Sequence, residues 1–168
     1  MKRSANDNMN ETGTGLERLD CDYFVDIHCH CLAATDDGPV TMAEALTLCR
    51  ALVDDGITTA IATPHQLGRF NGCNEAAEIR EKVRALNEEL SSNDIALNII
   101  GGAEVRVDER ICQLLNDDKI LTLADGGRYI LLELLHEVLI DIEPLLAELA
   151  SMGINTIISH PERHSNLM

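Results

Sequence analysis

The chain has 168 residues, of which 45% are hydrophobic, and this suits a single domain with a sizeable core. The formal net charge of −16 argues against non-specific nucleic-acid binding, because the phosphates would be repelled. No apolar run is long enough for a membrane span, and residues 1–20 do not resemble a signal peptide. We therefore expect a cytoplasmic protein with reduced thiols, a polar disordered lead-in over residues 1–20 and one folded domain over residues 21–168.

Beyond the lead-in, short strand patterns alternate with helical patterns. Thr41 and Glu44 form a capping box at the start of the first helix, and Asp141 is expected to cap the last one. Strands are predicted at residues 23–30, 58–65, 96–107, 128–135 and 154–159, and four helices are predicted between them, at 42–55, along a stripe from Ile79 to Leu90, at 109–118 and at 142–152. This alternation indicates an α/β domain with parallel strands, as in a (β/α) barrel.

Imidazole and carboxylate side chains follow these strands, and they are candidate metal ligands. They are His28, His30, Asp37, His65, Glu104, Glu133 and His160. Because the carboxyl ends of barrel strands converge on one face, we expect all seven side chains to share a cleft. Glu133 lies within the apolar run "YILLELL", where a carboxylate is costly unless it is paired or bound to a metal. The ligand types suit manganese, iron or zinc better than calcium.

The first strand contains the stretch "DIHCHC", in which histidines and cysteines alternate. In an extended strand His28 and His30 point to one face, while Cys29 and Cys31 point to the other. Asp26 falls on the histidine face and is a candidate for supporting the ligands. A thiolate zinc knuckle would instead need a loop and a second cysteine pair nearby, which the sequence lacks. We therefore predict a histidine site with the cysteines packed in the core.

Other polar residues receive plainer interpretations. Glu104 is our choice for a carboxylate that bridges two ions, because the two glycines before it allow close approach of the backbone. Asp36 is expected to be a turn residue, and His136 and His164 to be surface or supporting residues. Taken alone, His65 could simply end a strand before a turn. The segment "QLGRFNG" could be a mobile rim that presents Arg69 and Phe70 to a substrate, or an ordinary surface loop.

Six motifs together resemble a known family: "DIHCH", "DDGP", "GITTAIATPH", "GAEVRV", "YILLE" and "ISHPER". In this order they are similar to the PHP (polymerase and histidinol phosphatase) superfamily, and more closely to the bacterial capsular and exopolysaccharide tyrosine-protein phosphatases. The resemblance covers about residues 23–164. It implies a distorted (β/α) barrel with two or three metal ions, usually manganese, held by the seven ligands named above. It also implies that Arg163 contacts phosphate and that Arg106 lies near the substrate.

The implied reaction is metal-assisted hydrolysis of phosphotyrosine on a protein of capsule or exopolysaccharide synthesis, such as a bacterial tyrosine autokinase of polysaccharide export. A cysteine-dependent tyrosine phosphatase is excluded, because no cysteine begins a C-x5-R motif, and the G-x-x-x-x-G-K motif of a P-loop is missing too. Two alternatives stay open. One is a PHP phosphoesterase acting on a small-molecule phosphate, and the other is a metal-binding module without turnover.

The sequence also departs from the family pattern. Ala33 and Ala34 stand where a Pro-Gly pair is common, and the cysteines beside the histidines are unusual. Family members continue to an Asp-x-His motif that supplies two more ligands, whereas the final motif here is "HPER". We therefore expect an incomplete barrel with weak activity. Residues 154–159 should be an interior strand without a covering helix, so the open barrel edge should favour self-association.

Overall fold

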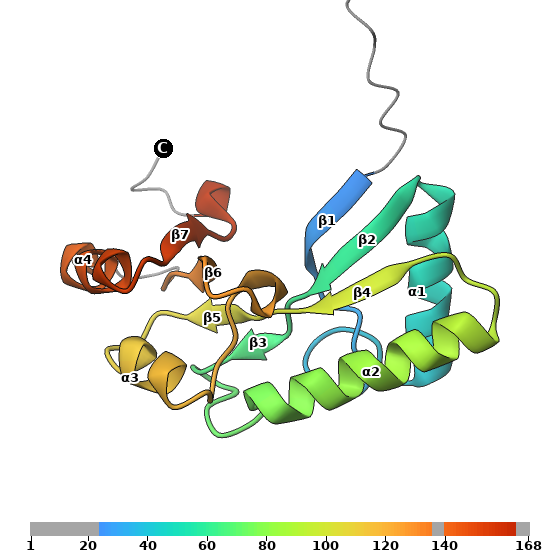
Figure 1. Ribbon diagram of the computed structural model, residues 1–168, viewed down its shortest axis with the longest axis horizontal. Helices are drawn as coiled ribbons and strands as arrows, with labels where there is room; N and C mark the ends of the chain where they lie inside the picture. Colours follow the sequence, from blue (N-terminus) through green and yellow to red (C-terminus); the bar gives the residue numbers. More distant parts are fainter. Residues whose placement is uncertain (1–23, 136–139, 164–168) are drawn as a thin grey trace, which may run out of the picture.

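The computed structural model describes residues 24–135 and 140–163 (Figure 1). These residues form parallel strands connected by helices, as the alternation in the sequence predicts. The strands are β1 (Phe24–Cys29), β2 (Ile57–Ala62), β3 (His65–Gln66), β4 (Asn98–Gly101), β5 (Glu104–Arg106), β6 (Tyr129–Glu133) and β7 (Asn155–Ile158). The helices are α1 (Met42–Asp54), α2 (Ala76–Ser92), α3 (Ile111–Asn116) and α4 (Glu143–Ser151), with short 3-10 helices η1 (Leu123–Asp125) and η2 (Pro161–Arg163).

The strands belong to two sheets, in the orders β1-β2-β4 and β3-β5-β6-β7. Two of the five predicted strands are each divided between these sheets. The second breaks at Thr63 and Pro64, and the third breaks at Gly102 and Ala103. Both breaks fall at the same level, since Ala62 pairs with Gly101 before them and His65 pairs with Glu104 after them. The five predicted strands therefore correspond to seven strands in the described part of the chain, because β2 and β3 come from one predicted strand and β4 and β5 from another.

Helix boundaries follow local capping chemistry. The predicted capping box is confirmed: the Thr41 side chain accepts from the Glu44 N–H, and the Glu44 carboxylate accepts from the Thr41 N–H. The chain leaves α1 through Gly56, whose φ of +85° is the left-handed conformation that glycine adopts easily. The expectation for α4 was wrong by one residue, because its N-cap is Ile142. Asp141 precedes the cap and accepts from the Glu143 N–H, which still satisfies a free backbone donor.

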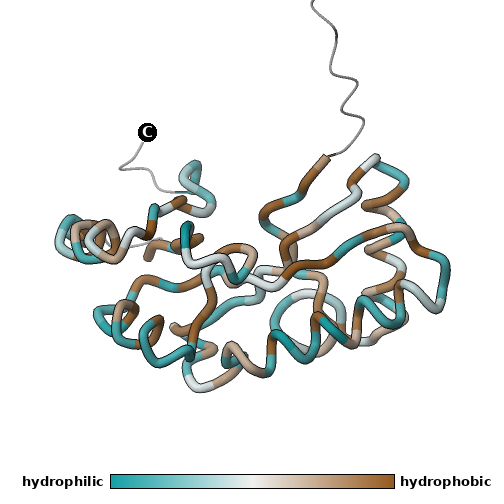
Figure 2. Tube along the Cα trace, viewed as in Figure 1, coloured by the Kyte–Doolittle hydropathy of each residue, from teal (hydrophilic) through white to brown (hydrophobic). Residues whose placement is uncertain are grey.

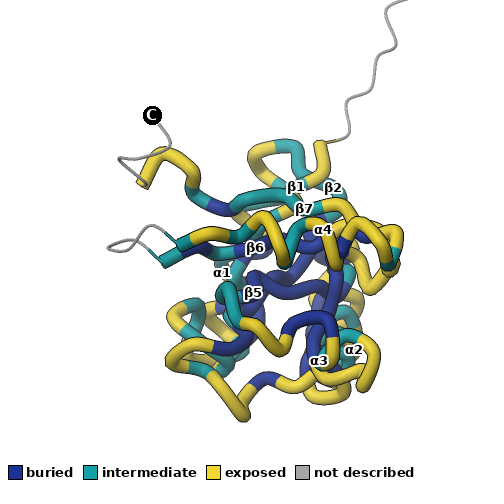
Figure 3. The backbone as a smooth tube through the Cα atoms, turned by 90° about the vertical axis from the view of Figure 1, so that its left-hand side faces the viewer, coloured by how far each residue is buried: buried dark blue, intermediate teal, exposed yellow. Residues whose placement is uncertain are grey.

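The core is aliphatic, and it lies between the sheets and the helices (Figure 2). The inward stripe of α2 includes Ile79, Leu86 and Leu90, all fully buried. The middle of β6 is buried as well, as its apolar run predicts. Figure 3 shows the same division, with buried backbone along β5 and β6 and exposed backbone on the outer sides of α3 and α4. A second, smaller cluster joins Ile61 and Leu131 with η1.

The two outermost strands, β1 and β7, are less well covered than the rest. On β1, Phe24, Val25 and Ile27 are 63%, 58% and 44% exposed. Strand β7 was expected to be an apolar strand without a covering helix after it, and in the structure Asn155 is exposed and the following three residues are only half-buried. Each strand forms the edge of its own sheet, and β1 and β7 do not pair with each other. Among the described helices, none is both long and apolar enough to cross a bilayer.

Candidate metal centre

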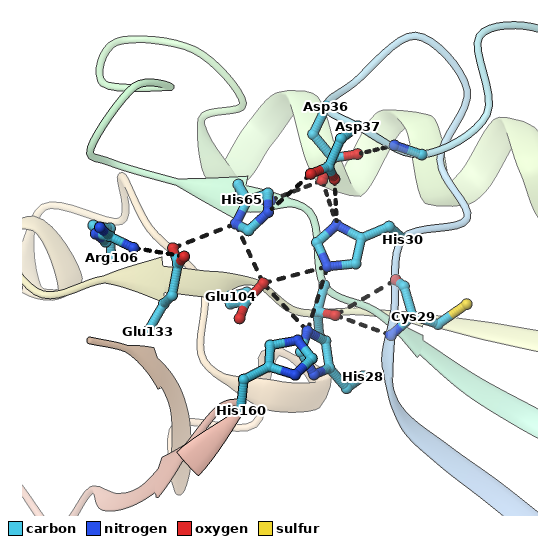
Figure 4. Close-up of polar contacts among 12 residues, drawn as sticks. His28, Cys29, His30, Asp36, Asp37, His65, Glu104, Arg106, Glu133 and His160 are labelled. Atoms are coloured by element: carbon cyan, nitrogen blue, oxygen red, sulfur yellow. Dashed lines mark hydrogen bonds and ion pairs between the residues drawn. The ribbon is translucent and has the colours of Figure 1, made fainter. Parts of the chain in front are cut away.

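The centre is built around one buried carboxylate. Glu104 begins β5 and is 1% exposed, and neither of its oxygens has a hydrogen-bond partner among the described residues. Three imidazole nitrogens face its Oε2 atom: Nε2 of His28 at 3.2 Å, Nε2 of His30 at 3.3 Å and Nδ1 of His65 at 3.2 Å (Figure 4). Burial would raise the pKa of Glu104, but the contacts with His28 and His30 outweigh it and hold that pKa far below its usual range.

The ligand candidates come from strand ends that the two sheets bring together. His28 lies on β1, and His30 follows the end of that strand. His65 begins β3 and pairs in register with Glu104. Glu133 ends β6, and His160 follows β7 with a positive φ of 44°. Their carboxylates and rings converge in Figure 4, as the rule for parallel strands predicts.

Three overlapping groups of side chains place ligand atoms within 4.8 Å of one another. The first group combines His30 and His65 with Asp36 and Asp37. The second combines His28, Glu104 and His160, and the third combines His65, Glu104 and Glu133. All seven predicted ligands are therefore brought together, with Asp36 in addition. Glu104 and His65 each belong to two groups, so they lie where neighbouring ions would share a ligand.

The residues present fit a metal ion. A buried carboxylate costs several kcal/mol unless cations or polar groups surround it, and a metal ion shared with the three imidazoles would supply such a partner to Glu104. Imidazole and carboxylate donors suit manganese, iron or zinc. Glu133 supports the same interpretation, because it is half-buried and lies 2.6 Å from Arg106 and 3.5 Å from Nδ1 of His65.

Asp36 was expected to be a turn residue, and that expectation covers only part of its role. Its Oδ1 does accept from the Gly38 N–H in a turn. However, the side chain is 1% exposed, and its Oδ2 also contacts Nδ1 of His30 at 2.6 Å and the N–H of His65 at 2.9 Å. Burial tends to raise the pKa of Asp36, but these contacts lower it overall. No short-range sequence pattern predicts these contacts, because they depend on how the loop folds back onto β3.

Two side chains from other elements hold the loop that carries Asp36. The buried Asn74 amide donates to the Thr35 and His65 carbonyl oxygens, each at 3.1 Å, so it connects the loop to β3. Lys82 on α2 donates to the Ala34 carbonyl and to the Thr35 hydroxyl. Lys82 also pairs with Glu78 at 3.0 Å, the i,i+4 pair that the sequence predicts.

Asp26 and the two cysteines lie on or just after β1. Asp26 accepts from the backbone N–H of His28 at 2.9 Å, so it stabilises the strand end rather than a ring. Cys29 and Cys31 are 6% and 0% exposed and belong to the core, and in Figure 4 the Cys29 sulfur points away from the histidines. Thr63 holds this strand end, because its hydroxyl accepts from the Cys29 N–H. The predicted alternation of histidines and cysteines is therefore confirmed in its geometry.

A cavity of about 710 Å³ opens over the centre. Most of the ligand candidates line this cavity. Three arginines line it as well, namely Arg69, Arg106 and Arg163. Arg69 lies 3.0 Å from Asp37 and Arg106 lies 2.6 Å from Glu133, whereas Arg163 on η2 lies 3.9 Å from its neighbour Glu162. Cationic side chains thus line the same cleft as the acidic ligand candidates, which is an arrangement suited to a bound anion.

An aromatic ring forms one wall of the cavity. Phe70 stacks parallel to His65, with 5.5 Å between ring centroids and 6° between planes. The Arg69 guanidinium lies 4.8 Å above the Phe70 ring. These contacts place both residues of the segment "QLGRFNG" beside the ligand candidates. The two histidines that we left outside the site, His136 and His164, lie outside the described residues.

The comparisons with known proteins agree with this geometry. Residues 24–168 match the family model described as capsular polysaccharide synthesis, CpsB/CapC. This chain belongs to that family. The tyrosine-protein phosphatase YwqE of Bacillus subtilis is 39% identical over 147 residues, which are 86% of this chain and 56% of the relative. The tyrosine-protein phosphatase CpsB of Streptococcus pneumoniae is 32% identical and covers 86% of this chain and 59% of its own length.

The fold is shared with a solved structure as well. A crystal structure described with YwqE from Bacillus subtilis and CpsB from Streptococcus pneumoniae, "unique metal-dependent tyrosine phosphatases", aligns with a TM-score of 0.81 at 37% identity. The alignment covers 86% of this chain and 58% of that chain. The predicted family and the PHP-type α/β fold are thereby confirmed. The chain spans a little over half the length of the relatives it matches.

A substitution at Gly38 tests whether the loop geometry matters for metal binding. A Cβ atom at Gly38 would lie 2.4 Å from the His30 carbonyl oxygen, so Gly38→Ala must displace the loop from the end of β1. We expect Gly38→Ala to weaken Mn²⁺ binding at least about tenfold in calorimetric titration, as loss of ligand support does elsewhere. Gly126→Ala is the control, because its Cβ would lie at ordinary contact distance, 3.5 Å from the Leu123 carbonyl oxygen and 3.9 Å from that of Ala124. Equal affinities in the two variants would contradict the prediction.

The alternation on β1 gives a second test. We expect His28→Ala to lower the metal content of the purified protein, because the ring of His28 faces Glu104. Cys31→Ser should keep the metal content but lower the free energy of unfolding by about 1–3 kcal/mol, since it buries a hydroxyl in an apolar core. Metal analysis and urea unfolding measure the two effects. Metal loss in Cys31→Ser without loss in His28→Ala would show that the thiols hold the ion.

Proposed function

We propose that this chain carries the active site of a metal-dependent phosphatase that hydrolyses phosphotyrosine on a protein. The observation that carries the proposal is the buried Glu104 carboxylate with three imidazole nitrogens within 3.3 Å of one oxygen, at the floor of a cleft lined by arginines. The relatives named as tyrosine-protein phosphatases support it. They include the putative tyrosine-protein phosphatase CapC of Staphylococcus aureus, which is 31% identical over 86% of this chain and 56% of its own length.

The metal would be held by the seven ligand candidates. They are His28, His30, Asp37, His65, Glu104, Glu133 and His160. Manganese is our proposal for the ion, with iron or zinc as the other metals that this donor set accepts. When bound, the ion supplies a Lewis acid and an activated water for attack on phosphorus. The carboxylates that face the cleft would repel a phosphate by themselves, so charge compensation is a condition for substrate binding.

The arginines would bind the phosphate group of the substrate. Arg163 and Arg106 line the cleft beside the ligand candidates, and a guanidinium fork can donate two hydrogen bonds to phosphate oxygens. Preorganised donors of this kind stabilise the charge that develops on the transferred phosphoryl group. In the reaction, a P–O bond forms to water and the P–O bond to the tyrosine oxygen breaks. Phosphate and tyrosine are released, and the phenol has a pKa of about 10, so its phenolate leaves without strong help from an acid.

Phe70 and Arg69 favour an aromatic substrate. The Phe70 ring stands at the cavity wall with one face against His65 and with Arg69 over it. A tyrosyl ring that enters the cleft can pack against this wall, which would orient the phosphate toward the centre. We therefore propose Arg69 and Phe70 as substrate-binding residues. This aromatic wall is our reason to expect a preference for aryl phosphates over alkyl phosphates.

The family and the thiols suggest where the enzyme works. Membership of a capsular polysaccharide synthesis family leads us to propose a protein of capsule or exopolysaccharide synthesis as the substrate, with a bacterial tyrosine autokinase as the partner. We place the reaction in the cytoplasm. The five cysteines within the described part of the chain are all free, as expected in a reducing compartment.

Metal dependence is the direct test of this function. We expect hydrolysis of a phosphotyrosine peptide to stop in excess EDTA and to return with Mn²⁺, because the chemistry depends on the ion and not on a thiolate. Iodoacetamide treatment of the folded protein is the control, and it should leave the rate unchanged. Histidinol phosphate, assayed in parallel, should give a lower kcat/KM than the peptide. Activity that survives EDTA, or that is lost on alkylation without unfolding, would contradict the proposal.

The exposed edge of β1 leads to a separate proposal, that the folded domain over residues 21–168 self-associates. Phe24, Val25 and Ile27 are exposed on a strand whose outer edge pairs with no other strand in the described part of the chain, which is the kind of surface that pairs with a second copy. We expect light scattering to give a mass that rises with protein concentration, and Val25→Lys to reduce it. Val40→Lys is the control, since Val40 is 72% exposed and lies outside β1. A monomer at all concentrations would contradict this proposal.

A further inference from the structure

Asp36 has a buried carboxylate with three donors around it and no role in the ligand set predicted from the sequence. One oxygen, Oδ1, accepts from the Gly38 N–H at 3.1 Å. The other, Oδ2, contacts Nδ1 of His30 at 2.6 Å and accepts from the His65 N–H at 2.9 Å. The side chain is 1% exposed, so water does not compete for these contacts. A single carboxylate thus connects the end of β1, the following loop and the start of β3.

The contact with His30 determines which ring nitrogen carries a proton. An ionised carboxylate can only accept hydrogen bonds, so Nδ1 of His30 must be the donor in this pair. In the neutral ring, Nε2 is then the atom with a free lone pair. That atom faces the centre, at 3.3 Å from both Oε2 of Glu104 and Nε2 of His28. Asp36 therefore lies on the opposite side of the His30 ring from Glu104 and His28, two members of the second group of ligand candidates.

We propose that Asp36 is a positioning residue, which fixes the tautomer and orientation of His30 and thereby sets the metal affinity of the centre. The proposal rests on the metal-dependent function proposed above. Its second part is that Asp36 also fixes His65 and Asp37, because it binds the N–H of the first and precedes the second in the loop. Carboxylates that support metal-bound histidines in this way typically change metal affinity about 10- to 100-fold.

The first experiment compares metal affinity in two matched variants. Asp36→Asn keeps the shape of the side chain but leaves one acceptor oxygen for three donors. We expect it to weaken Mn²⁺ binding about 10- to 100-fold in calorimetric titration. Asp141→Asn is the control, because Asp141 also accepts the N–H two residues later and touches no histidine in the described structure. It removes the same unit of charge and should bind Mn²⁺ like the wild type.

The second experiment determines which nitrogen of His30 carries the proton. Imidazole ¹H–¹⁵N correlation spectra of the Zn²⁺-loaded protein should show His30 with a protonated Nδ1, and Zn²⁺ is chosen because it is diamagnetic. In Asp36→Asn we expect this signal to be lost or to shift to the other tautomer. Should Asp36→Asn fail to fold, Asp36→Glu replaces it. That variant keeps the charge but moves the carboxylate by one methylene, and it should also bind Mn²⁺ more weakly than the wild type.

The outcomes separate the two proposals. Wild-type affinity and an unchanged His30 signal in Asp36→Asn would overturn the role of Asp36 while leaving the metal centre in place. Equal weakening in Asp36→Asn and Asp141→Asn would show a general charge effect, and it would overturn the positioning role too. A wild-type chain that binds neither Mn²⁺ nor Zn²⁺ would overturn the proposed function, and the positioning role with it.

Discussion

The burial of Glu104 is the constraint on which the rest of the molecule depends. A carboxylate removed from water costs several kcal/mol unless positive or polar partners surround it. Here those partners are the rings of His28, His30 and His65, all within 3.3 Å of one oxygen. The rings come from β1 and β3, and the carboxylate comes from β5, so their contact requires both sheets to be in place. The same contacts therefore stabilise the packing of the two sheets and assemble the site.

Charged side chains of both signs surround the Glu104 carboxylate. The acidic ligand candidates and their imidazoles form the floor, and the arginines stand at the wall. Burial tends to lower the pKa of His30, but contacts with Asp36 and Glu104 outweigh it and raise that pKa to about 10, so without an ion the ring is charged and attracted to both carboxylates. Outside the cleft, Asn74 and Lys82 hold the loop by neutral and cationic hydrogen bonds. The groups that line the cleft are thus supported by hydrogen bonds from side chains that do not line it.

The sequence predicted the features that depend on local periodicity. The alternation of His28 and His30 with two cysteines, and the cost of Glu133 in an apolar run, both pointed to the cleft. The capping box at Thr41 was likewise visible, because capping needs only residues close in sequence. By contrast, the contacts of Asp36 depend on a loop that folds back onto β3, which no short-range pattern records. The division of two strands was also missed, since the predicted strands over residues 58–65 and 96–107 each run through a junction between the sheets, at Pro64 and at Gly102.

The two strand breaks have the same length, and this has an evolutionary consequence. Ala62 and His65 flank one break, and Gly101 and Glu104 flank the other, with equal spacing on the two paths. One inserted or deleted residue in either break would turn its ligand to the opposite face, because side chains alternate along a strand. A matching change in the neighbouring break would be needed to restore the pairing of His65 with Glu104. Gaps in alignments of homologous chains should therefore avoid both breaks, or occur in both together.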